Sequence, residues 1–143
     1  MERPDVPCRP GADHAALQAA RVADFVAIPC RLSTFDGAAI SATLDLCRLA
    51  NKSTVVVLNA APIRSRVTAK AEEAISEKGG KVPPVIIRQR VAFQHCMIDG
   101  RTAAEYEPSG AAAEEITRLM AFLLSGILAN KQTGLPASRE KVA

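Results

Sequence analysis

The sequence predicts one α/β domain in which a parallel sheet lies between two layers of helices. Two apolar runs, residues 24–30 and 53–60, have the length of strands, and the second is rich in β-branched residues. Segments with helical periodicity precede, separate and follow these runs. Connections of this length join parallel strands. The 143 residues, 48% of them hydrophobic, suffice for one domain with a packed core.

The first third of the chain has the pattern of a helix, a strand and a helix. A helix is expected over residues 13–22, because Asp13 can cap it and the following run is rich in alanine. A buried strand follows at 24–30 and opens into a loop. The next helix should begin at the capping residues 33–36 and reach about Ala50. Its apolar residues, at helical spacing, are Ile40, Leu44 and Cys47.

The middle of the chain has the pattern of a strand, a helix and a strand. The run at 53–60 is apolar on both faces, as a central parallel strand is when helices cover both sides of the sheet. A helix capped by Ser65 follows, and Gly79-Gly80 end it. A third strand is expected at about 84–89. The apolar stripe of this helix is Val67, Ala71, Ala74 and Ile75.

The last part of the chain is expected to hold one long helix after an irregular segment. Turn signals at 99–101 and Pro108 predict a loose stretch before it. The helix should begin near Ser109 and extend to about residue 128. Its apolar face consists of Ala112, Ile116, Leu119, Met120, Leu123 and Ile127.

These elements predict a partial domain over residues 11–128, with about three strands and four main helices. Residues 1–10 have no apolar strand and are interpreted as a leader that is not native to the fold. The polar segment 129–143 contains a glycine and a proline and is expected to fray.

Composition excludes several classes of protein. No stretch approaches the roughly 18 apolar residues of a membrane helix, and no apolar export signal is seen, so a cytoplasmic location is expected. The cysteines at 8, 30, 47 and 96 lack the spacing of a zinc site and are expected to be reduced core thiols. Neither His14 nor His95 has a second ligand at helical spacing, so no metal site is predicted.

The net charge of +3 is unevenly spread along the chain. Residues 64–101 hold eight Lys/Arg against four acidic residues, whereas 102–128 hold four acidic residues against one arginine. This asymmetry is compatible with an anionic or nucleic-acid partner, although a solvated helix face is the more common explanation. With four Phe, one Tyr and no Trp, stacking platforms for single strands are not expected.

Ligands of parallel α/β sheets bind beyond the carboxyl ends of the strands. Three segments should meet at that edge, namely IPCRLST, NAAPIR and RQRVAF. Within the second, the amide of Asn59 carries both a donor and an acceptor and can hydrogen-bond the edge of a purine. An equally good interpretation is that Asn59 only makes a turn before Ala-Ala-Pro.

Four segments in order resemble the carboxyl-terminal half of ParA-type partition ATPases, the deviant Walker group that includes MinD. They are ADFVAIPCRLSTFDGAAI, VVVLNAAPIRSR, VIIRQRVAFQHCMIDGRTAAEYEP and AAAEEITRLMAFL. The resemblance implies a P-loop NTPase or Rossmann-like fold with ATP and magnesium as cofactors. It also implies a dimer that moves plasmid or chromosome cargo over nonspecific DNA, together with a centromere-binding adaptor. By the same resemblance Asn59 would read the adenine, and the loop at Arg88, Gln89 and Arg90 would close over the base.

The sequence departs from the family in its phosphate-binding part. Family members begin with a K-G-G-x-G-K-T/S loop whose backbone N–H groups cradle the phosphates and whose hydroxyl holds magnesium. The closest echo, EKGGK at 77–81, lacks the Gly-Lys-Ser/Thr ending and is interpreted as a helix C-cap. The family's D-x-P-P-G motif is matched only raggedly around Asp5, and Leu32-Ser33 stand where Pro-Ser is usual. Very weak ATP binding and no autonomous hydrolysis are therefore expected, and no catalytic residue is assigned.

Three hypotheses follow from these features. The chain is a truncated or degenerate ParA-type protein that is inactive alone and exposes an apolar sheet edge. Alternatively, it is a non-catalytic module that pairs with a full-length partition ATPase, or binds duplex DNA through Arg64, Arg66 and Lys70. A third reading is a small flavodoxin-like ligand binder that uses the same rim.

Overall fold

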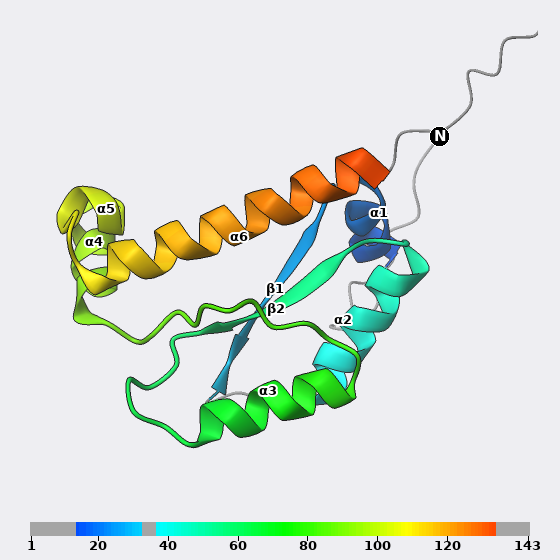
Figure 1. Ribbon diagram of the computed structural model, residues 1–143, viewed down its shortest axis with the longest axis horizontal. Helices are drawn as coiled ribbons and strands as arrows, with labels where there is room; N and C mark the ends of the chain where they lie inside the picture. Colours follow the sequence, from blue (N-terminus) through cyan, green and yellow to red (C-terminus); the bar gives the residue numbers. More distant parts are fainter. Residues whose placement is uncertain (1–13, 33–36, 134–143) are drawn as a thin grey trace, which may run out of the picture.

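The computed structural model describes residues 14–32 and 37–133, which form a small parallel sheet and six helices (Figure 1). The mixed α/β class expected from the sequence is confirmed. In chain order the elements are α1 (His14–Val22), β1 (Val26–Arg31), α2 (Gly37–Leu49), β2 (Thr54–Asn59), α3 (Val67–Glu77), α4 (Val91–Asp99), α5 (Ala103–Tyr106) and α6 (Ala111–Thr133).

The two strands pair in parallel, and α2 connects them. Val26 lies opposite Thr54 at one end of the pair, and Arg31 lies opposite Asn59 at the other. The sheet is therefore parallel, as predicted, but within the described residues it has two strands instead of three.

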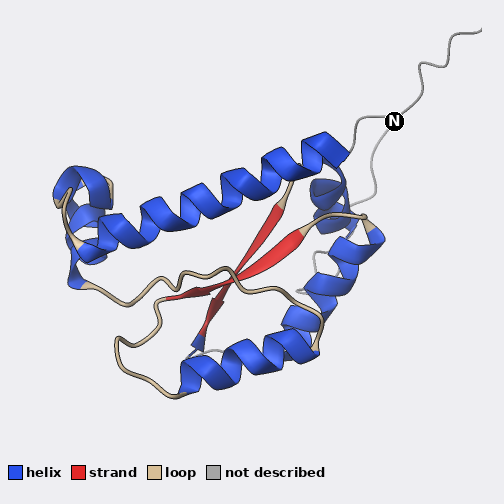
Figure 2. Cartoon of the chain, in the orientation of Figure 1, coloured by secondary structure: helices blue, strands red, loops and turns tan. Residues whose placement is uncertain are grey.

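Strand β2 is buried on both faces, as its continuous apolar sequence predicts. Val55 and Val57 face α6 and pack with its Leu119, Phe122 and Leu123. The alternate residues of β2 face α2 and α3, where the largest cluster of buried side chains lies. Figure 2 shows the strands between α6 on one side and α2 with α3 on the other. The cluster between the strands and helices α2 and α3 contains Cys30, Ile40, Leu44, Val56, Leu58, Ala71 and Ile75.

Strand β1, in contrast, is covered on one face only. Cys30 packs against the α2 side, whereas Ala27, Pro29 and Arg31 are exposed on the face that β1 shares with α6. The N–H of Val26 points toward β2 and donates to Ser53 O at 3.0 Å. Because the direction of the backbone groups alternates along a strand, those of Ala27, Pro29 and Arg31 point toward the outer edge of the sheet. No strand among the described residues pairs with that edge. Pro29, which has no N–H, stands there as is usual for edge strands.

The predicted third strand is wrong as a regular element. The segment 81–89 does follow β2, with Val56 N–H donating to Lys81 O at 2.7 Å and Ile87 N–H donating to Leu58 O at 3.0 Å. Between these two contacts lie five residues of the segment but only one residue of β2, so the ladder is interrupted. Two of the five are prolines, which cannot donate to a ladder. Only the bridge between Ala61 and Arg88 remains.

The segment 90–108, expected to be loose, contains two helices. Helix α4 ends at Gly100, which adopts the left-handed conformation with φ of 68°. Helix α5 begins with a capping box, in which Thr102 and Glu105 satisfy each other's backbone N–H groups. The turn expected at 99–101 is therefore present, but it separates helices. Residues 14–32 and 37–133 accordingly contain six helices, against the four main helices expected for the domain.

The remaining boundaries agree closely with the sequence pattern. Gly79, with φ of 74°, ends α3 together with Gly80, which confirms EKGGK as a helix C-cap. The hydroxyl of Ser65 accepts from Val67 N–H at 3.1 Å, next to the geometric N-cap Arg66. Helix α6 runs to Thr133, beyond the predicted end at residue 128.

Several sequence predictions fall on residues outside the described ranges. These are the leader 1–10 with Asp5, the cap Asp13, the capping residues 33–36, and the tail after Thr133. Over the described part of the chain, none of the helices has the length and apolar character needed to cross a membrane.

Candidate functional site

A cavity of about 480 Å³ opens beside the carboxyl ends of β1 and β2. Its apolar wall includes Ile28 of β1 and Ile40 of α2, and its polar groups include Arg31, Thr43 and Asn59. Arg31 and Asn59 are the last residues of their strands and lie opposite each other in the parallel register. The volume and the mixture of an apolar wall with a few polar groups suit a small organic ligand. Asn59, selected from the sequence, thus lines a cavity at the rim.

The backbone directly after Asn59 makes a sharp turn. Ala60 has φ of 50°, in the left-handed region that is uncommon for residues other than glycine. The turn brings Ala61, fully buried, beside the segment 87–89. Ala61 N–H donates to Ile87 O at 3.0 Å, and Gln89 N–H donates to Ala61 O at 2.8 Å. Asn59 and the Arg88 loop are therefore joined through Ala61, which the sequence analysis did not select.

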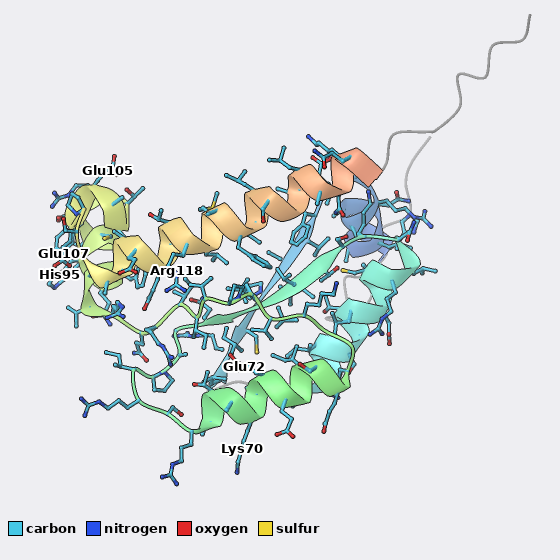
Figure 3. The ribbon with its side chains drawn as sticks, viewed as in Figure 1. Lys70, Glu72, His95, Glu105, Glu107 and Arg118 are labelled. Atoms are coloured by element: carbon cyan, nitrogen blue, oxygen red, sulfur yellow. The ribbon has the colours of Figure 1, made fainter. Side chains whose placement is uncertain are left out.

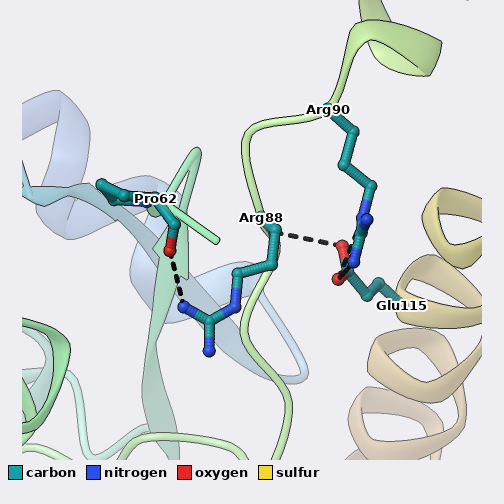
Figure 4. Close-up of polar contacts among 4 residues, drawn as sticks. All are labelled: Pro62, Arg88, Arg90 and Glu115. Atoms are coloured by element: carbon teal, nitrogen blue, oxygen red, sulfur yellow. Dashed lines mark hydrogen bonds and ion pairs between the residues drawn. The ribbon is translucent and has the colours of Figure 1, made fainter. Parts of the chain in front are cut away.

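Arg88 and Arg90 are held by neighbouring groups (Figure 4). The guanidinium of Arg88 donates to Pro62 O at 2.8 Å, and its backbone N–H donates to Glu115 Oε2 at 3.1 Å. Arg90 donates through Nε and Nη2 to Glu115 Oε1 at 3.1 and 2.6 Å. These hydrogen bonds, with the charge of Glu115, raise the pKa of Arg90 above its ordinary value.

Glu115 is the residue of this region that the sequence analysis missed. Its side chain is only 13% exposed, although it belongs to the acidic stretch that was read as a solvated face. The signal for it is indirect. An acidic residue near the start of a long helix can pair with a basic loop from an earlier part of the chain, but the pairing is visible only once both are placed. Arg88 and Arg90 thus fix the loop to α6, and the role that the resemblance implies for them stays a prediction.

The three basic residues proposed for DNA lie away from this cavity. Arg64 and Arg66 belong to the exposed loop between β2 and α3, and Lys70 is exposed on α3. Figure 3 shows Lys70 pointing from α3 away from the sheet. The carboxylate of Glu72, also on α3, lies instead toward the segment 83–88, where it lines a separate cavity of about 380 Å³.

The thiols and imidazoles take part in packing and local contacts. Cys30, Cys47 and Cys96 are free and buried, as expected for core thiols, and burial raises the pKa of Cys30. His95 Nδ1 lies 2.7 Å from the hydroxyl of Tyr106. Among the described residues there is no group of three His, Cys, Asp or Glu that is placed to hold a metal ion.

Comparison with protein-family models, with curated proteins and with solved structures found no match. The resemblance to ParA-type ATPases therefore rests on the sequence segments alone. What the structure adds is geometric. It places Asn59 at a rim cavity, and within the described residues the outer edge of the neighbouring strand β1 is unpaired.

Proposed function

We propose that this chain is the carboxyl-terminal half of a ParA-type partition protein, truncated or degenerate, which neither binds ATP tightly nor hydrolyses it alone. The observation that carries the proposal is the position of Asn59. It ends a buried parallel strand and lines a cavity whose apolar wall suits a flat heterocycle. An amide there can both donate to and accept from the edge of an adenine.

The groups around this cavity match the base of a nucleotide and leave its phosphates without a binding loop. Arg31 is the cation that lines the cavity, whereas tight phosphate sites combine several converging backbone N–H groups with a lysine. Since charge-assisted bonds to the phosphates are the strong ones, the base alone contributes little affinity.

The open side of the sheet supports the idea of a partial domain. The outer edge of β1 is unpaired within the described residues, and the face bearing Ala27 and Pro29 is exposed where β2 is buried under α6. A strand and a helix placed there would complete the sheet and its cover. The partner that supplies them is either the remainder of a longer gene product or a full-length partition ATPase.

Calorimetric titration with Mg·ATP tests this function. We expect no measurable heat from this chain, under conditions in which a partition ATPase with its Gly-rich loop binds. Micromolar binding would contradict the proposal. Translation of the DNA upstream of the coding region in all three frames provides an independent test, because a K-G-G-x-G-K-T/S loop in phase would identify the missing half.

A second candidate function is nonspecific binding of duplex DNA. It is favoured by the exposed cations Arg64, Arg66 and Lys70, because nonspecific binding needs contacts to the phosphates and none to the base edges. Retention on duplex DNA should fall steeply with added salt. The triple replacement by alanine should abolish it, whereas alanine at the half-buried Lys52 and the exposed Lys131 should change it little. No retention at low salt would exclude this function.

A further inference from the structure

Another cavity, of about 420 Å³, lies at the end of the sheet where both strands begin. Its walls come from the carboxyl-terminal parts of α2 and α6, the start of β2 and the turn after α3. It is at the opposite end of the strands from Asn59 and shares no lining residue with the rim cavity. A volume of this size accommodates a small organic molecule.

Two sets of side-chain contacts hold the walls of this cavity in place. On one side, Arg48 Nη2 donates to Lys78 O at 2.6 Å, which joins the end of α2 to the turn after α3. On the other side, Ser53 Oγ donates to Asn130 Oδ1 at 2.9 Å, and Asn130 Nδ2 donates to Asp24 O at 3.2 Å. These bonds join the end of α6 to the segments that precede both strands. The cavity is therefore preformed, and binding there does not require these elements to be ordered first.

The charged side chains that line this cavity are cationic. They are Arg48, Lys52 and Lys81, and the lining drawn from the described residues includes no aspartate or glutamate. Arg48 is paired with Asp45. None of the ion pairs in the described part of the chain involves Lys52 or Lys81. Two ammonium groups without a carboxylate partner, beside a concave surface, raise the local positive potential and attract an anion.

Much of the remaining lining is apolar. Leu44 and Val55 are buried there. Phe25 and Phe122 are half-buried. A Cβ at Gly126 would lie 2.9 Å from Cε2 of Phe25, so glycine allows this ring to lie against α6. Inorganic anions have no part that uses such a surface, whereas burial of an apolar ring against it is favourable.

We propose that this cavity binds a small organic acid in which a carboxylate is attached to an apolar ring. The ring contacts Phe25 and Phe122, and the carboxylate accepts charge-assisted hydrogen bonds from the ammonium groups of Lys52 and Lys81. This site goes beyond the proposed function, because it uses no residue of the rim cavity.

Titration of the isotope-labelled chain with 2-naphthoate, followed by nuclear magnetic resonance, tests the site. The expected result is a shift of the backbone amides of Ser53, Lys81 and Gly126, with a dissociation constant below about 1 mM. The neutral analogue 2-naphthamide should bind at least about tenfold more weakly, because it lacks the charge-assisted contact. No shift of these amides at millimolar 2-naphthoate, or equal binding of the two compounds, would overturn the proposal.

A charge-removing double variant identifies the anion-binding groups. Lys52→Gln with Lys81→Gln should weaken 2-naphthoate binding at least about tenfold and leave the binding of 2-naphthamide unchanged. The control Arg21→Gln with Arg101→Gln removes two positive charges at exposed residues outside the cavity and should change neither. Equal losses in the two double variants would reveal a nonspecific effect of net charge and exclude the site; circular dichroism verifies that each variant is folded. Neither compound carries a phosphate or a nucleobase, so this inference and the proposed function fail separately.

Discussion

Glu115 joins two parts of the molecule through a single carboxylate. One oxygen accepts from the backbone of Arg88 and the other from the guanidinium of Arg90, so the loop after the interrupted segment is tied to α6. The carboxylate of Glu115 is largely buried, and the side chain of Arg90 is 26% exposed. In its exposure to solvent, this ion pair is therefore intermediate between a surface pair and a fully buried pair. Its removal leaves a backbone N–H and a guanidinium without their acceptor.

We expect Glu115→Ala to lower the free energy of unfolding by about 1–3 kcal/mol, as for loss of a hydrogen-bonded charged group. Urea denaturation measures this. The control Glu73→Ala removes an exposed acid on α3 and should change stability by less than about 0.5 kcal/mol. Equal stability of the two variants would show that the carboxylate of Glu115 is not held as described.

The capping box of α5 predicts a dependence of stability on pH. The backbone N–H and the hydroxyl of Thr102 hydrogen-bond the carboxylate of Glu105 and lower its pKa from the ordinary value of 4.5. Because the folded state holds this proton more weakly than the unfolded state, the stabilisation is complete above pH 4.5 and is lost as the pH falls through the lowered pKa.

Glu105→Gln should therefore lower stability at about pH 6, and the difference should be smaller at about pH 3. Urea denaturation of both proteins at the two pH values measures it. Glu73→Gln, an exposed carboxylate on α3, serves as the control and should show no such convergence. A difference for Glu105→Gln that is the same at both pH values would contradict the assigned hydrogen bonds.

At the scale of elements, the sequence predicted those whose pattern is local. The apolar run of β2 and the stripe of α3 each determine one element by themselves, and both were found. The third strand was not found as a regular strand. A regular strand at 84–89 would have to pair continuously with β2, and Pro83-Pro84 interrupt that pairing. Helix α4 was missed since its apolar residues are spread around the helix, with Met97 and Ile98 exposed and Cys96 buried.

The turn between α4 and α5 allows a direct test of the element boundary. Gly100 has φ of 68°, and a Cβ there would meet no atom within 4 Å, so the cost of a side chain is conformational alone. Gly100→Ala should lower stability by about 1 kcal/mol, the cost of a left-handed alanine. Gly100→Asn should lower it less, because asparagine tolerates this conformation. Thermal or urea unfolding distinguishes the two; an unchanged stability in Gly100→Ala would contradict the left-handed cap.

At the scale of the whole molecule, the part of the chain that the structure describes covers both faces of the sheet at β2 and one face at β1. The parallel class and the rim position of Asn59 followed from the sequence, because strand order along the chain determines which loops meet. The cavity beside Asn59 and the anchoring of Arg88 and Arg90 by Glu115 could not be predicted, since they depend on contacts between residues far apart in the chain.

The central claim is that the base-reading rim is retained while the phosphate grip is lost. The most direct measurement is a titration of the isotope-labelled protein with adenosine and, separately, with Mg·ATP, followed by nuclear magnetic resonance at the side-chain amide of Asn59. We expect both ligands to shift this signal at millimolar concentrations, with similar dissociation constants, and Asn59→Ala to abolish the effect of both on neighbouring amides. Micromolar binding of Mg·ATP, or no response of Asn59 to either ligand, would contradict the account.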